Sequence, residues 1–173
     1  MAATAEKEIK YDLDGYEVIT AALRELISEY PGLALGDNIA FATLGEDSGK
    51  AMFPTRGAVI ETESKNVLGD VTQVCLYPFN LVYRAAGLSE NRKAGVKEWL
   101  DTFGRWLEKQ TITINGNTYT LDGYPKLSGN REFLTIERAT PAYLDSVNEN
   151  NSENWVISIS ARYRNKFNKF RSL

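Results

Sequence analysis

The segment from Val71 to Arg84 is the longest strand pattern in this chain of 173 residues, and it restricts the possible folds more than any other segment. Successive side chains of a strand point to opposite faces of the sheet. One face carries Val71, Cys75, Tyr77, Phe79, Leu81 and Tyr83, and the other carries Val74, Leu76 and Val82. Apolar side chains on both faces predict that helices cover one face and that the other meets a neighbouring surface.

The same strand forms the second arm of a long hairpin, Ala51 to Arg84, whose tip is expected at Ser64 to Asp70. Pro54 and Gly57 predict a bend or bulge in the first arm. Pro78 has no N–H to donate, and it therefore predicts a sheet edge or a bulge in the second arm. A hairpin that is apolar on both faces is equally compatible with contact with another subunit and with a larger twisted sheet within a monomer.

Two helices are predicted from apolar residues that recur at three- and four-residue spacing. The first runs from Gly15 to Tyr30 and ends at Pro31-Gly32. Asp14, followed three residues later by Glu17, resembles a capping box and predicts Asp14 as the N-cap. The second follows Ser89, and its apolar stripe consists of Val96, Trp99, Leu100, Phe103, Trp106 and Leu107.

Further strand patterns complete the prediction of the fold. Residues 111–121 form a hairpin signal around Asn115-Gly116, a pair that suits a type I′ turn. Residues 132–138 and 155–164 alternate between apolar and polar side chains, and residues 145–154 are expected to form a polar, Asn-rich loop. Helices separated by runs of strands favour an α+β fold, an antiparallel or mixed sheet with a long hairpin and two main helices packed on one face.

The length fits one domain. We expect a mobile leader at residues 1–13, the single α+β domain at residues 14–165 and a basic tail at residues 166–173. The start of the chain is acidic and the end is basic, through Glu6, Glu8, Asp12, Asp14 and Glu17 on one side and Arg162, Arg164, Lys166, Lys169 and Arg171 on the other. A solvated last strand and tail is the favoured interpretation of the basic chain end, and the alternative is its contact with phosphate or with the acidic start of a neighbouring copy.

Histidine is absent, and the only cysteine is Cys75. A Ser/His/Asp or Cys/His arrangement and any zinc site with histidine are therefore excluded, and we predict no catalytic residue, cofactor site or metal site. Cys75 is expected to be a buried, inert thiol. The carboxylates Glu61, Glu63 and Asp70 flank the hairpin tip, where a solvated hairpin is favoured over acid–base or magnesium chemistry. Tyr77 and Phe79 are expected in the core rather than stacked on bases.

Two segments carry a resemblance to a known family. The first is GKAMFPTRGAVIETESKNVLGDVTQVCLYPFNLVYRAAG, and the second is ENRKAGVKEWLDTFGRWLEKQ, in which Trp-Leu recurs after seven residues. Together they resemble the tail terminator proteins of long-tailed bacteriophages, also called tail completion or minor capsid proteins. The helix that ends at Tyr30-Pro31 and the closing strand WVISISARYRNKF fit in order and length, so that the resemblance spans about residues 15–165.

The resemblance implies an α+β fold, a structural function and no catalytic residue. Proteins of this family form a ring, typically hexameric, on the head-proximal end of the tail tube, where they stop tube polymerisation and offer a surface for head joining. The implied partners are copies of the chain itself, the tail tube protein and a head-completion protein, with DNA passing through the ring. The implied location is the host cytoplasm during assembly and then the virion tail. Neither a membrane nor a specific nucleic acid is expected as a partner.

On this interpretation the subunit or tube interface is expected at Glu61, Glu63, Lys65, Asp70, Arg84, Arg162 and Arg164. Charge reversal at Arg162 and Arg164 is expected to weaken assembly. Two alternatives stay open. A small carboxylate- or tyrosine-dependent enzyme acting on a sugar or nucleotide needs a deep pocket with two acids of divergent pKa. A sheet-type nucleic-acid binder that uses the basic tail would lose DNA affinity steeply with salt.

Overall fold

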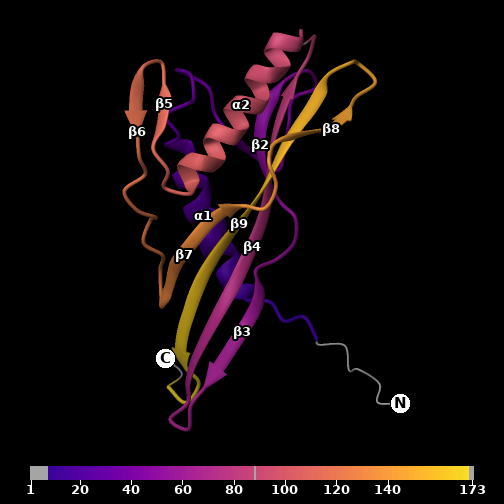
Figure 1. Ribbon diagram of the computed structural model, residues 1–173. Coiled ribbons are helices and arrows are strands. Elements are labelled where there is room, and N and C mark those ends of the chain that lie inside the picture. Colours follow the sequence, from indigo (N-terminus) through magenta and orange to yellow (C-terminus); the bar gives the residue numbers. More distant parts are fainter. Residues whose placement is uncertain (1–7, 88, 172–173) are drawn as a thin grey trace, which may run out of the picture.

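Figure 1 shows the computed structural model, which describes residues 8–87 and 89–171. Within these residues the predicted α+β class is confirmed, with two helices, a seven-stranded mixed sheet and a separate two-stranded hairpin. The elements in chain order are α1 (Leu13–Ser28), β1 (Ala40–Phe41), β2 (Gly49–Pro54), β3 (Val59–Lys65), β4 (Asp70–Ala85), α2 (Glu90–Leu107), β5 (Ile112–Ile114), β6 (Asn117–Tyr119), β7 (Arg131–Arg138), β8 (Tyr143–Val147) and β9 (Glu153–Asn168).

The strands β4 and β9 form the axis of the molecule. Each has 16 residues, and they pair antiparallel from Asp70 opposite Asn168 to Ala85 opposite Glu153. At about 3.3 Å per residue this ladder is about 50 Å long. The other strands flank only parts of it: β2 and β3 both pair with β4, while β7 and β8 both pair with β9. The sheet is antiparallel except for the short parallel pair β1 and β2.

Both helices pack on one face of this sheet. The side chains of β4 and β9 that point toward them are at most 1% exposed and belong to the same core as the helices, namely Cys75, Tyr77, Phe79, Leu81, Ile157, Ile159, Ala161 and Tyr163. The hydroxyl of Thr20 in α1 lies 2.7 Å from that of Tyr77. Gly104 allows α2 to approach closely, because a Cβ there would lie 3.0 Å from Cδ1 of Ile157. Helices on one face are therefore confirmed.

The first helix begins two residues earlier than predicted, because Asp12 and not Asp14 is its N-cap. The Asp12 carboxylate accepts a hydrogen bond from the backbone N–H of Gly15 at 3.0 Å. The second helix has the predicted N-cap, Ser89, whose hydroxyl accepts from the N–H of Arg92. Among the described residues, neither helix combines the length and apolar character needed to cross a lipid bilayer.

The long hairpin is interrupted on one side near Pro78. The strand β2 ends at Pro54 and β3 begins at Val59, so the predicted bend in the first arm is confirmed. The carbonyl of Pro78 accepts from the N–H of Thr55 at 3.1 Å, so this side of Pro78 faces the gap between β2 and β3. The proline thus lies at a break in the partner strand, where its missing N–H costs no ladder hydrogen bond.

The predicted polar loop at residues 145–154 is wrong. Residues 143–147 form β8, and β9 begins at Glu153, so that only a short turn separates the two paired strands. The error arises because polar side chains do not prevent pairing when a long neighbouring strand offers its backbone. At the other end, β9 continues to Asn168 and includes the first residues of the predicted basic tail. Residues 172–173 lie outside the described residues.

The part of the predicted leader that the structure describes is joined to the sheet. The carbonyl of Lys10 accepts from the N–H of Ile60 at 2.9 Å, and the N–H of Asp12 donates to the carbonyl of Ala58 at 2.8 Å. Tyr11 forms an isolated antiparallel bridge with Val59. Residues 10–12 therefore run along the start of β3. Residues 1–7 of the predicted leader lie outside the described residues.

Candidate assembly surface

The sheet face that points away from the helices, which we term the open face, has no described helix over it. Its side chains come from the central strands β4 and β9 and from the flanking strands β3 and β7. Those of β4 are partly exposed and mostly apolar, whereas those of β9 are polar. The open face comprises Val59, Glu61, Val74, Leu76, Pro78, Asn80, Val82, Glu132, Glu137, Ser158, Ser160, Arg162 and Arg164.

Two ion pairs lie on the open face. Nε of Arg162 is 3.1 Å from Oε2 of Glu61, and Arg164 is 3.6 Å from Glu132. Because β4 lies between β3 and β9, the Arg162 side chain spans β4 to reach its partner. A register shift at Glu61 marks a β-bulge, a feature that commonly re-aims a side chain. Exposed pairs contribute about 0–1 kcal/mol each, so these pairs shape the surface more than they stabilise the fold.

The seven predicted interface residues do not form one surface. Glu61, Arg162 and Arg164 share the open face. Glu63, Lys65 and Asp70 lie near the hairpin tip, with Lys65 3.1 Å from Glu63. Arg84 lies at the far end of β4, where its side chain donates to Asn154 at 2.8 Å and to the carbonyl of Gly45 at 2.9 Å. The physical reason is the length of β4, which separates its two ends by about 50 Å.

The hairpin tip is a rigid apolar projection, shorter than predicted. Oδ1 of Asn66 accepts from the N–H groups of Leu68 and Asp70 at 3.0 and 2.9 Å. Gly69 has φ +87°, and a Cβ there would lie 2.3 Å from the Phe170 ring, so glycine permits both the turn and the aromatic contact. Val67 and Leu68 are 95% and 71% exposed.

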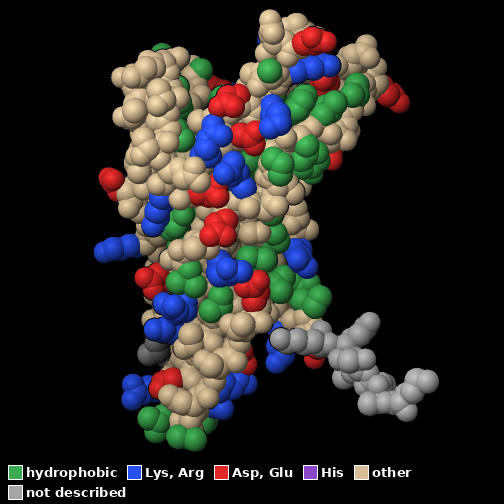
Figure 2. Space-filling view, in the orientation of Figure 1, with side chains coloured by type: hydrophobic (Ala, Val, Ile, Leu, Met, Phe, Trp, Pro, Cys, Tyr) green, Lys and Arg blue, Asp and Glu red, His purple; other side chains and the backbone are tan. Residues whose placement is uncertain are grey.

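Basic and aromatic residues of the chain end adjoin this tip. Figure 2 shows the apolar tip with Lys and Arg side chains on both sides. We term this region the basic end, and it comprises Val67, Leu68, Lys166, Phe167, Lys169, Phe170 and Arg171. Phe167 and Phe170 are functional candidates that the sequence analysis did not single out, because it treated residues 166–173 as a basic tail. The available signal was the continuation of the every-second-residue spacing of Ala161 and Tyr163 to Phe167.

A buried ion pair holds the start of the chain against the sheet. Asp12 is 8% exposed, and Arg131 at the start of β7 donates to its two oxygens at 3.0 and 2.8 Å. The hydroxyl of Tyr163 in β9 donates to Asp12 at 2.8 Å. Burial by itself would raise the pKa of Asp12, but the hydrogen bonds from Arg131 and Tyr163 and the charge of Arg131 outweigh it and lower that pKa.

Burial raises the pKa of Cys75 to about 11, as expected for an inert thiol.

The ion pair predicts a loss of stability in acid. An aspartate in the unfolded chain titrates near pH ~3.9, whereas folded Asp12 has a lowered pKa. Its stabilising contribution is therefore present above the unfolded pKa and is lost as the pH falls through the folded one. We expect the free energy of unfolding, measured with urea between pH 7 and pH 3, to fall less in Asp12→Asn than in the wild type. An equal fall in both proteins would contradict this assignment.

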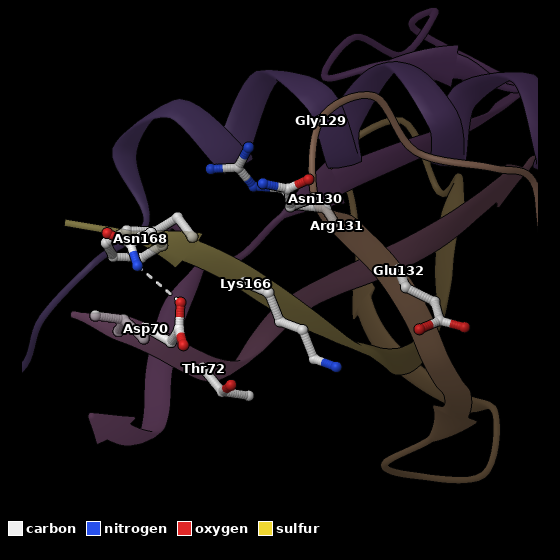
Figure 3. Close-up of a pocket in the computed structure, with 10 residues that line it drawn as sticks. Asp70, Thr72, Gly129, Asn130, Arg131, Glu132, Lys166 and Asn168 are labelled. Atoms are coloured by element: carbon white, nitrogen blue, oxygen red, sulfur yellow. Dashed lines mark hydrogen bonds between the residues drawn. The ribbon is translucent and has the colours of Figure 1, made fainter. Parts of the chain in front are cut away.

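A pocket of about 500 Å³ lies beside the basic end, between β4, β9 and the start of β7. Figure 3 shows Asp70, Thr72, Lys166 and Glu132 around it, with Asp70 hydrogen-bonded to Asn168 at 2.8 Å. Hydrogen bonds from the side chains of Asn66 and Asn168 lower the pKa of Asp70. A general acid that works near neutral pH needs a raised pKa, so Asp70 does not suit that role.

Two further observations bear on the chemistry of the surface. Among the described residues, no three His, Cys, Asp or Glu side chains are grouped so that they could hold a metal ion. Tyr77 and Phe79 are 0% and 1% exposed and face the helices. Because they belong to the core, β4 does not present them for stacking on nucleic-acid bases.

Comparisons with known proteins give no identification. No protein-family model matches the chain, and no curated protein matches it significantly.

Proposed function

We propose that this protein is a structural assembly protein that forms a ring on the head-proximal end of a phage tail tube. The ring would end tube polymerisation and offer the surface for joining to the head, through a head-completion protein. The protein would assemble in the host cytoplasm and remain in the virion tail. Two observations support the proposal: the resemblance of residues 15–165 to tail terminator proteins, and the geometry of the molecule.

The open face is the observation that carries the proposal. A sheet in a layered domain buries both faces wherever both carry apolar side chains. Here helices cover one face, while Val74, Leu76 and Val82 on the other lie partly exposed beside two ion pairs. A surface of mixed apolar and paired polar character is typical of contacts between subunits. The resemblance to tail terminator proteins implies two partners for this surface, namely other copies of the chain and the tail tube protein.

A ring of identical subunits needs heterologous contacts, in which one patch of a subunit meets a different patch of the next. Such contacts require no bound metal, disulfide or histidine. The chain offers two patches besides the open face, one at each end of the β4–β9 ladder. Its composition and its geometry are therefore compatible with an assembly function.

A tube-length assay tests the proposal. We expect that adding this protein to polymerising tail tube protein from the same phage or prophage shortens the tubes seen by electron microscopy. The informative variant is Ser160→Arg, because Ser160 lies in the middle of the open face, opposite Pro78 on β4 and Glu137 on β7. An added bulky cation there would obstruct docking, so shortening should require at least about tenfold more protein, a change of about 1.4 kcal/mol.

The matched control is Thr113→Arg on β5, an exposed position of the separate hairpin. It should shorten tubes as the wild type does. Both variants should unfold within about 0.5 kcal/mol of the wild type, as surface substitutions usually do. Arg162 and Arg164 are less suitable targets, because their reversal would also break ion pairs within the chain. Tubes of unchanged length with wild-type protein would contradict the proposed function.

A further inference from the structure

The two ends of the β4–β9 ladder differ in charge. At the basic end, Lys166, Lys169 and Arg171 take part in none of the ion pairs found among the described residues. At the opposite end, two loops precede β2 and β9 and lie beside Arg84 and Ala85. We term this region the acidic end. Its exposed carboxylates are Glu46, Asp47, Asp145 and Glu149, whereas Glu153 beside Ala85 is buried and pairs with Lys93 at 3.3 Å.

The acidic end is held in one arrangement. The side-chain amide of Asn150 joins its two loops, because Nδ2 donates to Oδ1 of Asp47 at 3.0 Å and to the carbonyl of Glu46 at 3.2 Å. Arg84 joins the first loop to β9 through Gly45 and Asn154. The four exposed carboxylates of this end make no ion pair within the described chain. A preorganised surface loses little entropy on binding.

Both ends also carry exposed apolar side chains. Val67, Leu68 and Phe170 project from the basic end, and Leu144 and Val147 of β8 are exposed at the acidic end. Exposed apolar side chains framed by charge of one sign are typical of a surface that meets a partner of the opposite sign. The two ends complement each other in charge, and both have apolar area to bury.

We propose that the basic end of one copy docks head to tail on the acidic end of a second copy. The inference rests on the proposed function, and it supplies a heterologous contact through which a ring can close. It also replaces the alternative in which the acidic start meets the basic chain end of a neighbour. In the structure Asp12 already pairs with Arg131 of its own chain, and residues 10–12 run along β3.

A charge-swap experiment tests the contact. Variant one carries Lys166→Glu and Lys169→Glu, and variant two carries Glu46→Lys and Glu149→Lys, which leave the hydrogen bond between Asn150 and Asp47 in place. Light scattering at about 50 mM salt, where screening is weak, should show self-association of the wild type and at least about tenfold weaker association of each variant alone. An equimolar mixture should recover association, because the reversed end of one variant is then complementary to the reversed end of the other, and the two intact ends are complementary to each other.

The control variant reverses two exposed cations elsewhere, Arg56→Glu and Lys126→Glu, with the same change in net charge as variant one. It should associate as the wild type does, and salt of about 500 mM should weaken the wild-type contact. The proposal is overturned if each variant associates alone, if the mixture shows no recovery, or if the wild type stays monomeric. It is also overturned if the basic end binds a DNA duplex while self-association is unaffected by the swap. The tube-length assay reports on the proposed function in each of these cases.

Discussion

Replacing Asp12 with alanine is expected to lower the free energy of unfolding by about 3–5 kcal/mol, because it leaves the partly buried charge of Arg131 without its partner. The Asp12 carboxylate accepts from the Arg131 guanidinium, the Tyr163 hydroxyl and the N–H of Gly15. The substitution therefore also removes the N-cap of α1, a loss of about 1 kcal/mol by itself. Urea unfolding of the purified protein at pH 7 measures the change.

Asp14→Ala is the matched control, since Asp14 is exposed in the first turn of the same helix. It removes a carboxylate near the helix N-terminus and should cost at most about 1 kcal/mol. The double variant Asp12→Ala/Arg131→Ala should be more stable than the sum of the two single effects predicts, because it removes both charges together. A loss below about 1 kcal/mol in Asp12→Ala would show that the pair does not hold the chain start to the sheet.

The sequence allowed correct prediction of elements whose signals are local. Ser89 caps α2, and the apolar stripe that follows it defines the helix. Asn115 and Gly116 both have positive φ, at 51° and 81°, as the predicted type I′ turn requires. The inward face of β4 followed from the apolar residues at every second position from Cys75 to Tyr83. In each case neighbouring residues determine the outcome.

Prediction failed where a distant residue decides between local alternatives. Asp12 and Asp14 both suit an N-cap, and the choice depends on Arg131, which lies 119 residues further along the chain. The pairing of β8 depends in the same way on β9, whose backbone offers a ladder to a short segment that Asp145 at its centre disfavours as a strand. Local propensity is a weak guide in such places, because tertiary contacts override it.

The candidate surface also has features that local sequence signals predicted and features that depend on distant residues. The sequence placed the charges near the hairpin, but it did not show that the fold distributes them over separate parts of the molecule. Glu61 meets Arg162 across an intervening strand, whereas Arg84 lies at the other end of the ladder. The acidic end was hidden from sequence analysis because Asp47 and Asn150 are brought together only by the folded sheet. Contacts at a sequence separation of about 100 residues have no local pattern.

Replacing Phe103 with alanine is expected to be as damaging as the loss of Asp12, at about 3–5 kcal/mol of unfolding free energy. Phe103 is fully buried in α2, and its ring lies 5.1 Å from that of Tyr30 and is stacked on that of Trp99 at 6.0 Å. Alanine would leave a cavity where α2 packs against Tyr30, just after the end of α1, and the surrounding rings limit the collapse of such a cavity.

The contrasting variant is Phe170→Ala, which removes an aromatic ring that is 69% exposed at the basic end. It should cost at most about 1 kcal/mol, since little apolar area is lost from the folded core. Urea unfolding followed by tryptophan fluorescence suits the comparison, because Trp99 and Trp106 lie in the ring cluster around Phe103. If the two substitutions lowered stability equally, the aromatic cluster would not be a main contact between α2 and the segment that follows α1. If Phe170→Ala also weakened self-association while the folded chain stayed intact, the effects of the core and of the basic end would be separated by one pair of variants.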